Sequence, residues 1–228
     1  MMRNIAIIPA RSGSQGIKDK NLMEIKGKTL LEIAVQEALN SELISRVIVS
    51  TDSQYYAELA QSYGAETPFL RPVHISGSEA TALDVIRHTM TELGIDDDIK
   101  IAYLQPTSPF RIAADIDKAI MLLDNYDDVV SVVDVPHNML PESLMVEKSD
   151  GSLSHYNNDK NHSYLRQKKA QNFVARNGPA IYASWSNFIK KEKPYSGRTG
   201  YFKMSKLRSL DIDDETDLLI ARQIITLI

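Results

Sequence analysis

A chain of 228 residues is long enough to bury one sizeable hydrophobic core, and its 43% hydrophobic and 25% charged residues are typical of a globular protein. The net charge of −4 argues against a general binder of nucleic acid or of anionic membranes, and the lack of cysteine excludes disulfides, thiolate metal sites and cysteine nucleophiles. The apolar run Ile5–Ile8 is too short for a signal peptide and no stretch reaches transmembrane length, so we expect a cytoplasmic protein.

Apolar runs and helical patterns alternate along the first 134 residues. The runs expected to form buried strands are Ile5–Pro9, Arg46–Ser50, Ile99–Leu104 and Asp128–Asp134. The segments with helical spacing or helix caps are Thr29–Leu39, Thr51–Gly64, Glu79–Leu93 and Ile112–Leu123. Strands that alternate with helices predict a Rossmann-like three-layer α/β/α fold with a mainly parallel central sheet.

The alternation breaks after Pro136. Residues 136–172 are polar, lack a clear period and hold three of the five histidines, which indicates an insertion within a single domain of residues 1–228. Beyond it we expect a strand over Phe173–Trp185, a last strand over Leu207–Ile212 and a last helix over Thr216–Ile228.

The loop after the first strand, residues 10–16 (ARSGSQG), favours phosphate binding. Glycines let backbone N–H groups turn toward an anion, and Arg11 and Lys20 add positive charge. Gly13 and Gly16 are only three residues apart, so the ATPase P-loop is excluded, and the dinucleotide-binding pattern is absent as well. A plain connection with surface charges is the alternative interpretation.

Two further strand ends carry polar side chains. The segment LQPTSPFR, residues 104–111, presents the amide of Gln105 and two hydroxyls, although a proline-rich turn that caps the next helix would look the same. In LDIDDETD, residues 210–217, Asp211 and Asp213 would point the same way along an extended strand and could share Mg²⁺. The alternative is that Asp213 or Asp214 caps the last helix.

A fourth group is basic. Arg166 lies in YLRQKK and Arg176 in ARNGPAIY, and either guanidinium could bind a carboxylate or a phosphate through two hydrogen bonds. A solvated charged face is the alternative interpretation. The histidines show no metal-ligand spacing, and no G-x-S-x-G elbow occurs.

Taken in order, these segments resemble the acylneuraminate cytidylyltransferase family, the CMP-sialic acid synthetases. The resemblance rests on IIPARSGSQGIKDKN, LQPTSPFR, ARNGPAIY and LDIDDETD, and it runs over nearly the whole chain. It implies a fold like that of nucleotide-diphospho-sugar transferases, with Mg²⁺ as cofactor. It also implies transfer of CMP from CTP to the anomeric hydroxyl of a nonulosonic acid, and a homodimer that the insertion helps to form.

The resemblance also implies roles for single residues. Arg11 and Lys20 would act in catalysis and hold the triphosphate together with Ser12, Gly13 and Ser14. Asn21 would contact the nucleotide, and Arg71, Ser78 and Thr81 would help to recognise cytosine and ribose. Gln105 would orient the sugar acid, Arg166 and Arg176 would bind substrate, and Asp211 and Asp213 would be catalytic ligands of Mg²⁺.

Several alternatives stay open. A cytidylyltransferase for the eight-carbon acid Kdo shares the sheet, a glycosyltransferase would use an Asp-x-Asp motif, and a nucleotide-binding regulator would have lost catalysis. The block PARSGSQG favours the neuraminate branch, the position of Asp211–Asp213 near the end of the chain disfavours a glycosyltransferase, and retention of the metal pair disfavours a regulator. Where many relatives have a proline, this chain has Lys168-Lys169-Ala170, and sialic, legionaminic and pseudaminic acids stay open as substrates.

Overall fold

The computed structural model describes residues 4–13, 17–95, 98–156, 173–178 and 180–225. The chain divides into two compact units, one of residues 1–132 with 176–228 and one of residues 133–175. Each unit is described by itself. The predicted substrate-binding residues Ser14 and Arg166 lie outside the described residues.

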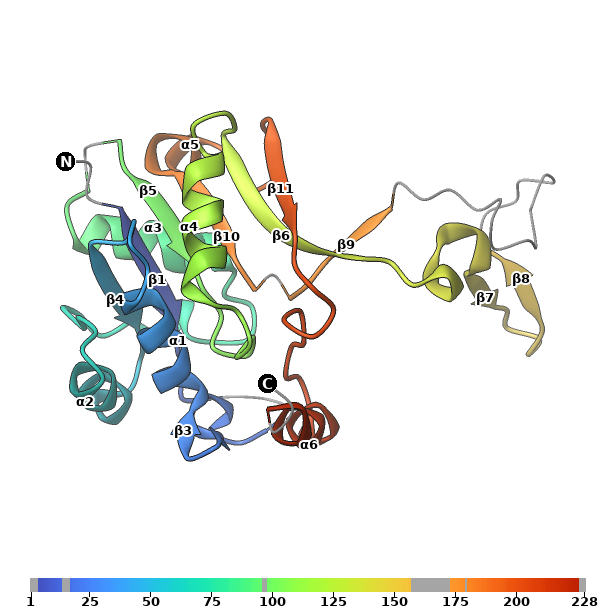
Figure 1. The fold of residues 1–228 in the computed structure, drawn as a ribbon, viewed down its shortest axis with the longest axis horizontal. Coiled ribbons are helices and arrows are strands. Elements are labelled where there is room, and N and C mark those ends of the chain that lie inside the picture. The colour runs from blue at the N-terminus through green and yellow to red at the C-terminus, as the bar shows by residue number, and fades with distance from the viewer. Residues whose placement is uncertain (1–3, 14–16, 96–97, 157–172, 179, 226–228) are drawn as a thin grey trace. The chain divides into compact units, whose positions relative to one another are not determined.

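A central sheet organises the first unit (Figure 1). Its strands follow the order β11-β6-β10-β5-β1-β4, and β9 also pairs with β6. Their bounds are β1 Ile5–Pro9, β4 Arg46–Ser50, β5 Lys100–Tyr103, β6 Asp128–Asp134, β9 Val174–Arg176, β10 Tyr182–Trp185 and β11 Thr199–Lys203. β1 pairs in parallel with β4 and β5, and β11 with β6, whereas β10 runs antiparallel to both of its neighbours.

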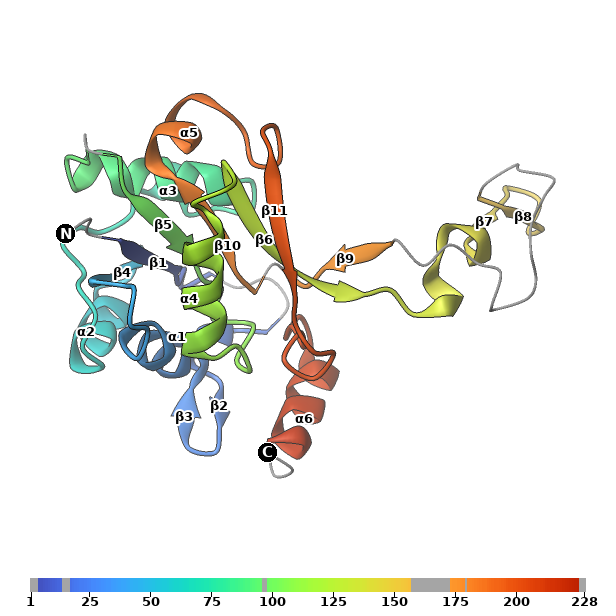
Figure 2. The same ribbon diagram turned by 45° about the horizontal axis from the view of Figure 1, so that its top comes forward.

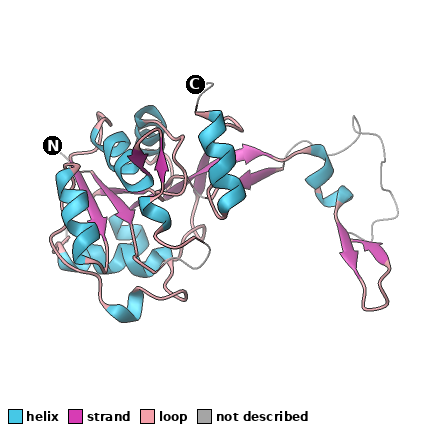
Figure 3. Ribbon diagram, turned by 90° about the horizontal axis from the view of Figure 1, so that it is seen from below, coloured by secondary structure: helices cyan, strands magenta, loops and turns pink. Residues whose placement is uncertain are grey.

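Helices cover both faces of this sheet (Figure 3). α1 (Leu30–Leu39), α2 (Gln54–Ser62) and α4 (Ala113–Leu122) contribute to one buried apolar cluster, and α3 (Ala82–Glu92) and α5 (Ser186–Lys191) contribute to another. The three-layer α/β/α fold predicted from the sequence is confirmed, with a mixed sheet because of β10.

Helix starts follow local capping chemistry. The side chains of Thr29, Ser53 and Thr81 accept hydrogen bonds from the first turns of α1, α2 and α3. Thr81 and Asp84 form a capping box, which explains why α3 begins at Ala82 and not at the predicted Glu79.

The predicted strand over Leu207–Ile212 is wrong. The last strand is β11, in which Gly200 and Phe202 are buried while Tyr201 is exposed. The residues after it form a turn, in which the backbone N–H of Ser209 donates to the carbonyl of Ser205 at 3.0 Å. Because these backbone groups bond locally, the segment has no strand partner among the described residues.

A third apolar cluster lies where the N-terminal and C-terminal parts of the chain meet. The hairpin of β2 (Glu24–Ile25) and β3 (Lys28–Thr29) turns at Lys26-Gly27, where both residues have positive φ, 51° and 74° (Figure 2). Its Ile25 packs in one buried cluster with Ile212 and with Leu218 of α6 (Glu215–Ile224). This packing brings the segment that carries Asp211 and Asp213 beside the chain that follows the first loop.

The second unit holds two short 3₁₀ helices, η3 (His137–Met139) and η4 (Pro141–Ser143), and a hairpin of β7 (Met145–Glu147) and β8 (Leu153–His155). Among its described residues, Leu140 is the one apolar side chain that is fully buried. Across the described parts of both units, every helix is too short or too polar to cross a membrane.

Candidate active site

Several chain segments meet at one edge of the sheet in the first unit. Because β1, β4 and β5 are parallel, the loops that follow them start at the same edge. The segment before β10 joins them, since Tyr182 at the start of β10 lies opposite Tyr103 at the end of β5. A cavity of about 450 Å³ opens there.

The cavity collects seven residues that the sequence analysis singled out. Its lining includes Arg11, Lys20, Asn21, Arg71, Ser78, Gln105 and Asp213. These residues come from loops that are up to two hundred positions apart in the chain, so the fold and not local sequence brings them together.

The other predicted residues lie elsewhere. Ser12 and Gly13 follow Arg11 but are not part of the lining, and the Thr81 side chain is occupied in capping α3. Asp211 is not part of the lining either, and its Oδ1 accepts from the Ser108 hydroxyl at 3.4 Å. Arg176 is exposed, and its guanidinium lies 5.1 Å from the centre of the Tyr195 ring.

The start of the glycine loop is held from two sides. Ser12 donates its backbone N–H and its hydroxyl to the two carboxylate oxygens of Asp52, at 2.9 and 3.1 Å. The buried amide of Asn21 donates to the carbonyl of Arg11 at 3.2 Å. The backbone at Arg11 and Ser12 is therefore held in place, and Asn21 both lines the cavity and supports this backbone.

Arg71 is the most informative residue in the cavity wall. It is only 5% exposed, and its Nε and Nη2 are buried without a hydrogen-bond partner in the described part of the structure. Burial lowers the pKa of this guanidinium, with opposing contributions from Tyr103 and Asp52. An arginine stays protonated through such a shift, so a positive group with two unsatisfied N–H donors lies at the cavity, and its charge suits an anionic ligand.

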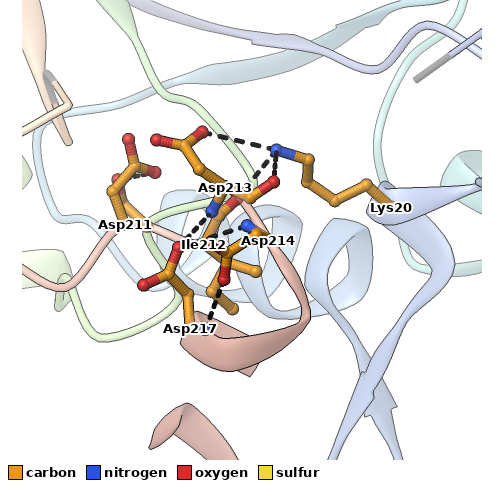
Figure 4. A network of polar contacts seen from close by, with 7 residues as sticks. Lys20, Asp211, Ile212, Asp213, Asp214 and Asp217 are labelled. Atoms are coloured by element: carbon orange, nitrogen blue, oxygen red, sulfur yellow. Dashed lines mark hydrogen bonds and ion pairs between the residues drawn. The ribbon is translucent and has the colours of Figure 1, made fainter. Parts of the chain in front are cut away.

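Lys20 joins the first loop to the acidic segment (Figure 4). Its ammonium donates to the carbonyls of Ile212 and Asp213, at 2.9 and 3.2 Å, and lies 3.4 Å from the Asp213 carboxylate. This contact places a cation and a carboxylate at one end of the cavity.

Asp211 and Asp213 direct their carboxylates to the same side of their segment (Figure 4). Burial raises the pKa of Asp211, and the neighbouring Asp213 raises it further, whereas hydrogen bonds from Thr107 and Ser108 and the charge of Lys20 lower it. A Cβ on Gly178, where φ is +108°, would lie 2.7 Å from Oδ2 of Asp211, so glycine leaves room for this carboxylate.

The alternative that Asp213 or Asp214 caps the last helix is confirmed for Asp214. Asp214 is the N-cap of α6, and it forms a capping box with Asp217. Asp213 instead offers a side chain that is 80% exposed, and Asp211 bonds the loop after β5. Both carboxylates are thus free of a capping role.

This pair fits a divalent cation that is shared with a phosphate. The described residues contain no group of three or more side chains that could hold a metal by themselves. Mg²⁺ commonly takes one or two carboxylates and completes its shell with water and phosphate oxygens. Two carboxylates beside a cation-lined cavity match that requirement.

Sequence reasoning missed three residues of this edge. Asp52 anchors Ser12, Tyr103 lines the cavity next to Arg71, and Arg111 lies beneath the loop that carries Gln105. Asp52 lies two residues after a predicted strand and Tyr103 near the end of another, so their position near a strand end was the available signal. Thr107, one of the two hydroxyls expected in this loop, bonds Asp211.

Comparisons with known proteins agree on one family. A sequence model described as cytidylyltransferase matches residues 5–225. The N-acylneuraminate cytidylyltransferase of Escherichia coli O18:K1:H7 is 35% identical over 95% of this chain and 51% of that protein. The CMP-N,N'-diacetyllegionaminic acid synthase of Campylobacter jejuni is 27% identical over 100% of this chain and 97% of that protein.

A solved structure of CMP:2-keto-3-deoxy-manno-octonic acid synthetase complexed with CTP has a TM-score of 0.74 at 15% identity, over 99% of each chain. At that identity the likeness supports the fold alone. The chain spans about half the length of the N-acylneuraminate cytidylyltransferases that it matches, 51% and 52%.

Proposed function

Because this chain belongs to the cytidylyltransferase family, we propose that it transfers CMP from CTP to the anomeric hydroxyl of a nonulosonic acid and releases pyrophosphate. Sequence relatives bear the names of enzymes for acylneuraminic, diacetyllegionaminic and pseudaminic acids. They favour a nine-carbon acid over the eight-carbon Kdo, whose synthetase resembles this chain in fold at 15% identity.

The observation that carries the proposal is the charge arrangement of the cavity. Arg11, Lys20 and Arg71 line one cavity together with Asp213, and Asp211 lies beside it. The orphaned N–H groups of Arg71 are the strongest part, because a buried unpartnered guanidinium costs stability unless an anion binds it. The triphosphate of CTP supplies such an anion.

We assign Mg²⁺ to Asp211 and Asp213. Their hard oxygen ligands and their common orientation support this assignment. A Mg²⁺ ion held by these two carboxylates would supply positive charge opposite the transferred phosphorus and the leaving pyrophosphate.

The protein's own residues would bind and orient the two substrates. The resemblance implies that Arg71 recognises cytosine and ribose, but its unpartnered buried donors favour a phosphate, so Arg71 and Arg11 would hold phosphate oxygens. Lys20 would neutralise charge next to the acidic segment. Gln105, at the end of the central strand β5, would present its amide to the sugar acid. The new bond joins the anomeric oxygen to the α-phosphorus as the bond to pyrophosphate breaks, so no covalent nucleophile is required.

The unit of residues 133–175 is proposed as a dimer contact. Its described residues bury one apolar side chain fully, while Met145, Val146, Leu153 and Tyr156 are between 44% and 64% exposed. A unit of this size cannot build a core of its own. A second copy of the chain would cover these side chains. The cytoplasmic location expected from the sequence stays a prediction.

The test is an activity panel. Purified protein with CTP and Mg²⁺ should release pyrophosphate with at least one of sialic, legionaminic and pseudaminic acids, and not with Kdo. Replacing CTP by UTP controls for recognition of the base, and omission of the sugar acid controls for plain hydrolysis. Folded protein that stays silent with every acid would refute the proposal.

A further inference from the structure

Arg111 is a buried cation that the proposed reaction does not use directly. It lies between β5 and α4 and is 2% exposed. Burial lowers its pKa to about 10, opposed by the charges of Glu37, Asp211 and Asp115. It therefore stays protonated at neutral pH, inside the protein.

Its hydrogen bonds join two loops of the site. Nη1 donates to the carbonyl of Gln105 at 2.6 Å and to the carbonyl of Ala180 at 3.0 Å. Gln105 begins the loop after β5, and Ala180 ends the segment that precedes β10. A single nitrogen thus fixes the distance between the two loops.

Both loops touch Asp211. From the first, the Ser108 hydroxyl donates to Oδ1 of Asp211 at 3.4 Å. In the second, Gly178 approaches the same carboxylate so closely that a Cβ would lie 2.7 Å from Oδ2. Because Arg111 holds the two loops at a fixed distance, it also fixes the space between them in which the Asp211 carboxylate lies.

Fold stability alone does not account for an arginine here. Its Nε and Nη2 are buried without a partner in the described part of the structure, and an apolar side chain of similar size would avoid that cost. We infer that Arg111 is a positioning residue, which holds Gln105 and Asp211 in register for the sugar acid. The expected effect on turnover rests on the proposed function, whereas the effect on loop geometry does not.

The test compares Arg111→Lys with a matched control, Arg87→Lys. Arg87 also donates to two backbone carbonyls, those of Ile189 and Glu192 at 2.9 and 3.0 Å, but it lies on α3 and contacts the chain around α5. Lysine keeps the charge at both positions and loses the planar fork that sets the geometry.

In Arg111→Lys we expect kcat to fall by about 10²-fold, the cost of a misplacement near 1 Å, with a raised KM for the sugar acid. The Kd for CTP measured without Mg²⁺ should stay within about twofold, because the cations assigned to the triphosphate lie on other loops. Arg87→Lys should leave all three constants unchanged. A general loss of stability would move both kinetic constants and the CTP affinity together, and that result would overturn the inference.

Hydrogen exchange gives a readout that does not depend on turnover. The amide protons of residues 104, 105, 107, 108 and 180–182 should exchange about tenfold faster in Arg111→Lys, and at the wild-type rate in Arg87→Lys. Unchanged exchange would overturn the inference even if the enzyme is active. Faster exchange in a protein that releases no pyrophosphate would support the positioning role and refute the proposed function separately.

The variant Arg111→Met covers the case in which lysine at position 111 still donates hydrogen bonds to the carbonyls of Gln105 and Ala180. It removes the donors and keeps the apolar volume, so it should show the same kinetic split as Arg111→Lys or a larger one. If Arg111→Met keeps wild-type kcat and sugar-acid KM, or if neither variant folds, the residue has no positioning role and the inference is wrong.

Discussion

Two buried cations at opposite ends of the parallel strands differ in the hydrogen-bond partners that the chain gives them. Lys100 starts β5 and is 8% exposed; its ammonium donates to the carbonyl of Ile120 at 3.0 Å, pairs with Asp124 and lies 5.1 Å from the centre of the Trp185 ring. Arg71, at the carboxyl end of β4, is 5% exposed and keeps two nitrogens without a partner in the described part of the structure.

The two cations differ in their partners: Lys100 is paired within the chain and stabilises the fold, whereas Arg71 has donors that a ligand could satisfy. At the amino ends of the strands, hydrogen bonds satisfy a buried charge within the chain, so removing that charge should cost stability. At the carboxyl ends the Arg71 guanidinium keeps donors without a partner in the described part of the structure, so removing it should weaken the affinity for an anionic ligand. Four predictions test this comparison.

The largest effect is expected for Asp211→Asn. The amide keeps the size of the side chain and loses the negative charge assigned to Mg²⁺, so Mg²⁺-dependent turnover should fall by about 10³-fold. Because burial already disfavours the charged form of Asp211, shown by its raised pKa, the free energy of unfolding should not fall.

Asp214→Asn is the matched control for that variant. It changes a carboxylate in the same segment, but asparagine caps a helix as well as aspartate does, so both stability and turnover should persist. Equal activity of Asp211→Asn and the wild type would show that the carboxyl-end carboxylates do not act in the reaction.

The second prediction concerns Arg71→Met. The change removes the orphaned donors, so binding of CTP, measured by calorimetry, should weaken by about 1.5–3 kcal/mol, the contribution of hydrogen bonds to a charged group. The thermal midpoint should stay equal or rise, because an unpaired buried charge is gone. A lower thermal midpoint with unchanged CTP affinity would mean that Arg71 stabilises the fold and does not bind CTP.

The third prediction is the counterpart at the other end, Lys100→Met. Loss of the donor leaves the buried carbonyl of Ile120 without this hydrogen bond, while Asp124, whose side chain is 67% exposed, can turn to water. We expect the free energy of unfolding to fall by about 1 kcal/mol in urea titrations. The Kd for CTP should not change, and a weaker affinity would argue that the two ends are not independent.

The sequence predicted the parts of this architecture that local chemistry determines. The bounds of β1, β4 and β6 coincide with the predicted strands, because buried apolar runs end at Pro9, at Ser50 and after Val133. The start of α2 was predicted from the capping residues Thr51-Asp52-Ser53, of which Ser53 is the N-cap, and α1 was predicted from its apolar spacing. Both signals depend only on neighbours in the sequence.

Features that depend on distant contacts were not predictable in this way. The reversed direction of β10 follows from its pairing with β5 and β6. Leu207–Ile212 has the apolar content of a strand, but it forms a turn whose last residue, Ile212, donates its N–H to the carbonyl of Thr107. Motifs located most of the candidate site, whereas Asp52 and Arg111 gained their meaning only from loops that the fold brings to them. Burial of Arg71 without a partner is likewise a property of the assembled sheet edge.

The smallest effect is expected for Arg46→Ala, at the amino end of β4. Arg46 donates to both carboxylate oxygens of Glu66, at 2.9 and 2.6 Å, and this hydrogen bonding lowers the pKa of Glu66. Both side chains are partly exposed, so the pair should contribute only about 0.5 kcal/mol to stability at pH 7.

The pH dependence gives the sign of that contribution. A carboxyl whose pKa is lowered by folding stabilises the protein above its unfolded pKa of about 4.3, and the stabilisation is lost as the pH falls through the lower folded value. The difference in free energy of unfolding between Arg46→Ala and the wild type should therefore be largest near neutral pH and vanish in acid, with Glu66→Gln behaving alike. If the difference in free energy of unfolding persists at low pH, Arg46 stabilises β4 by packing. The Arg46–Glu66 ion pair would then contribute nothing measurable, although both charges are paired.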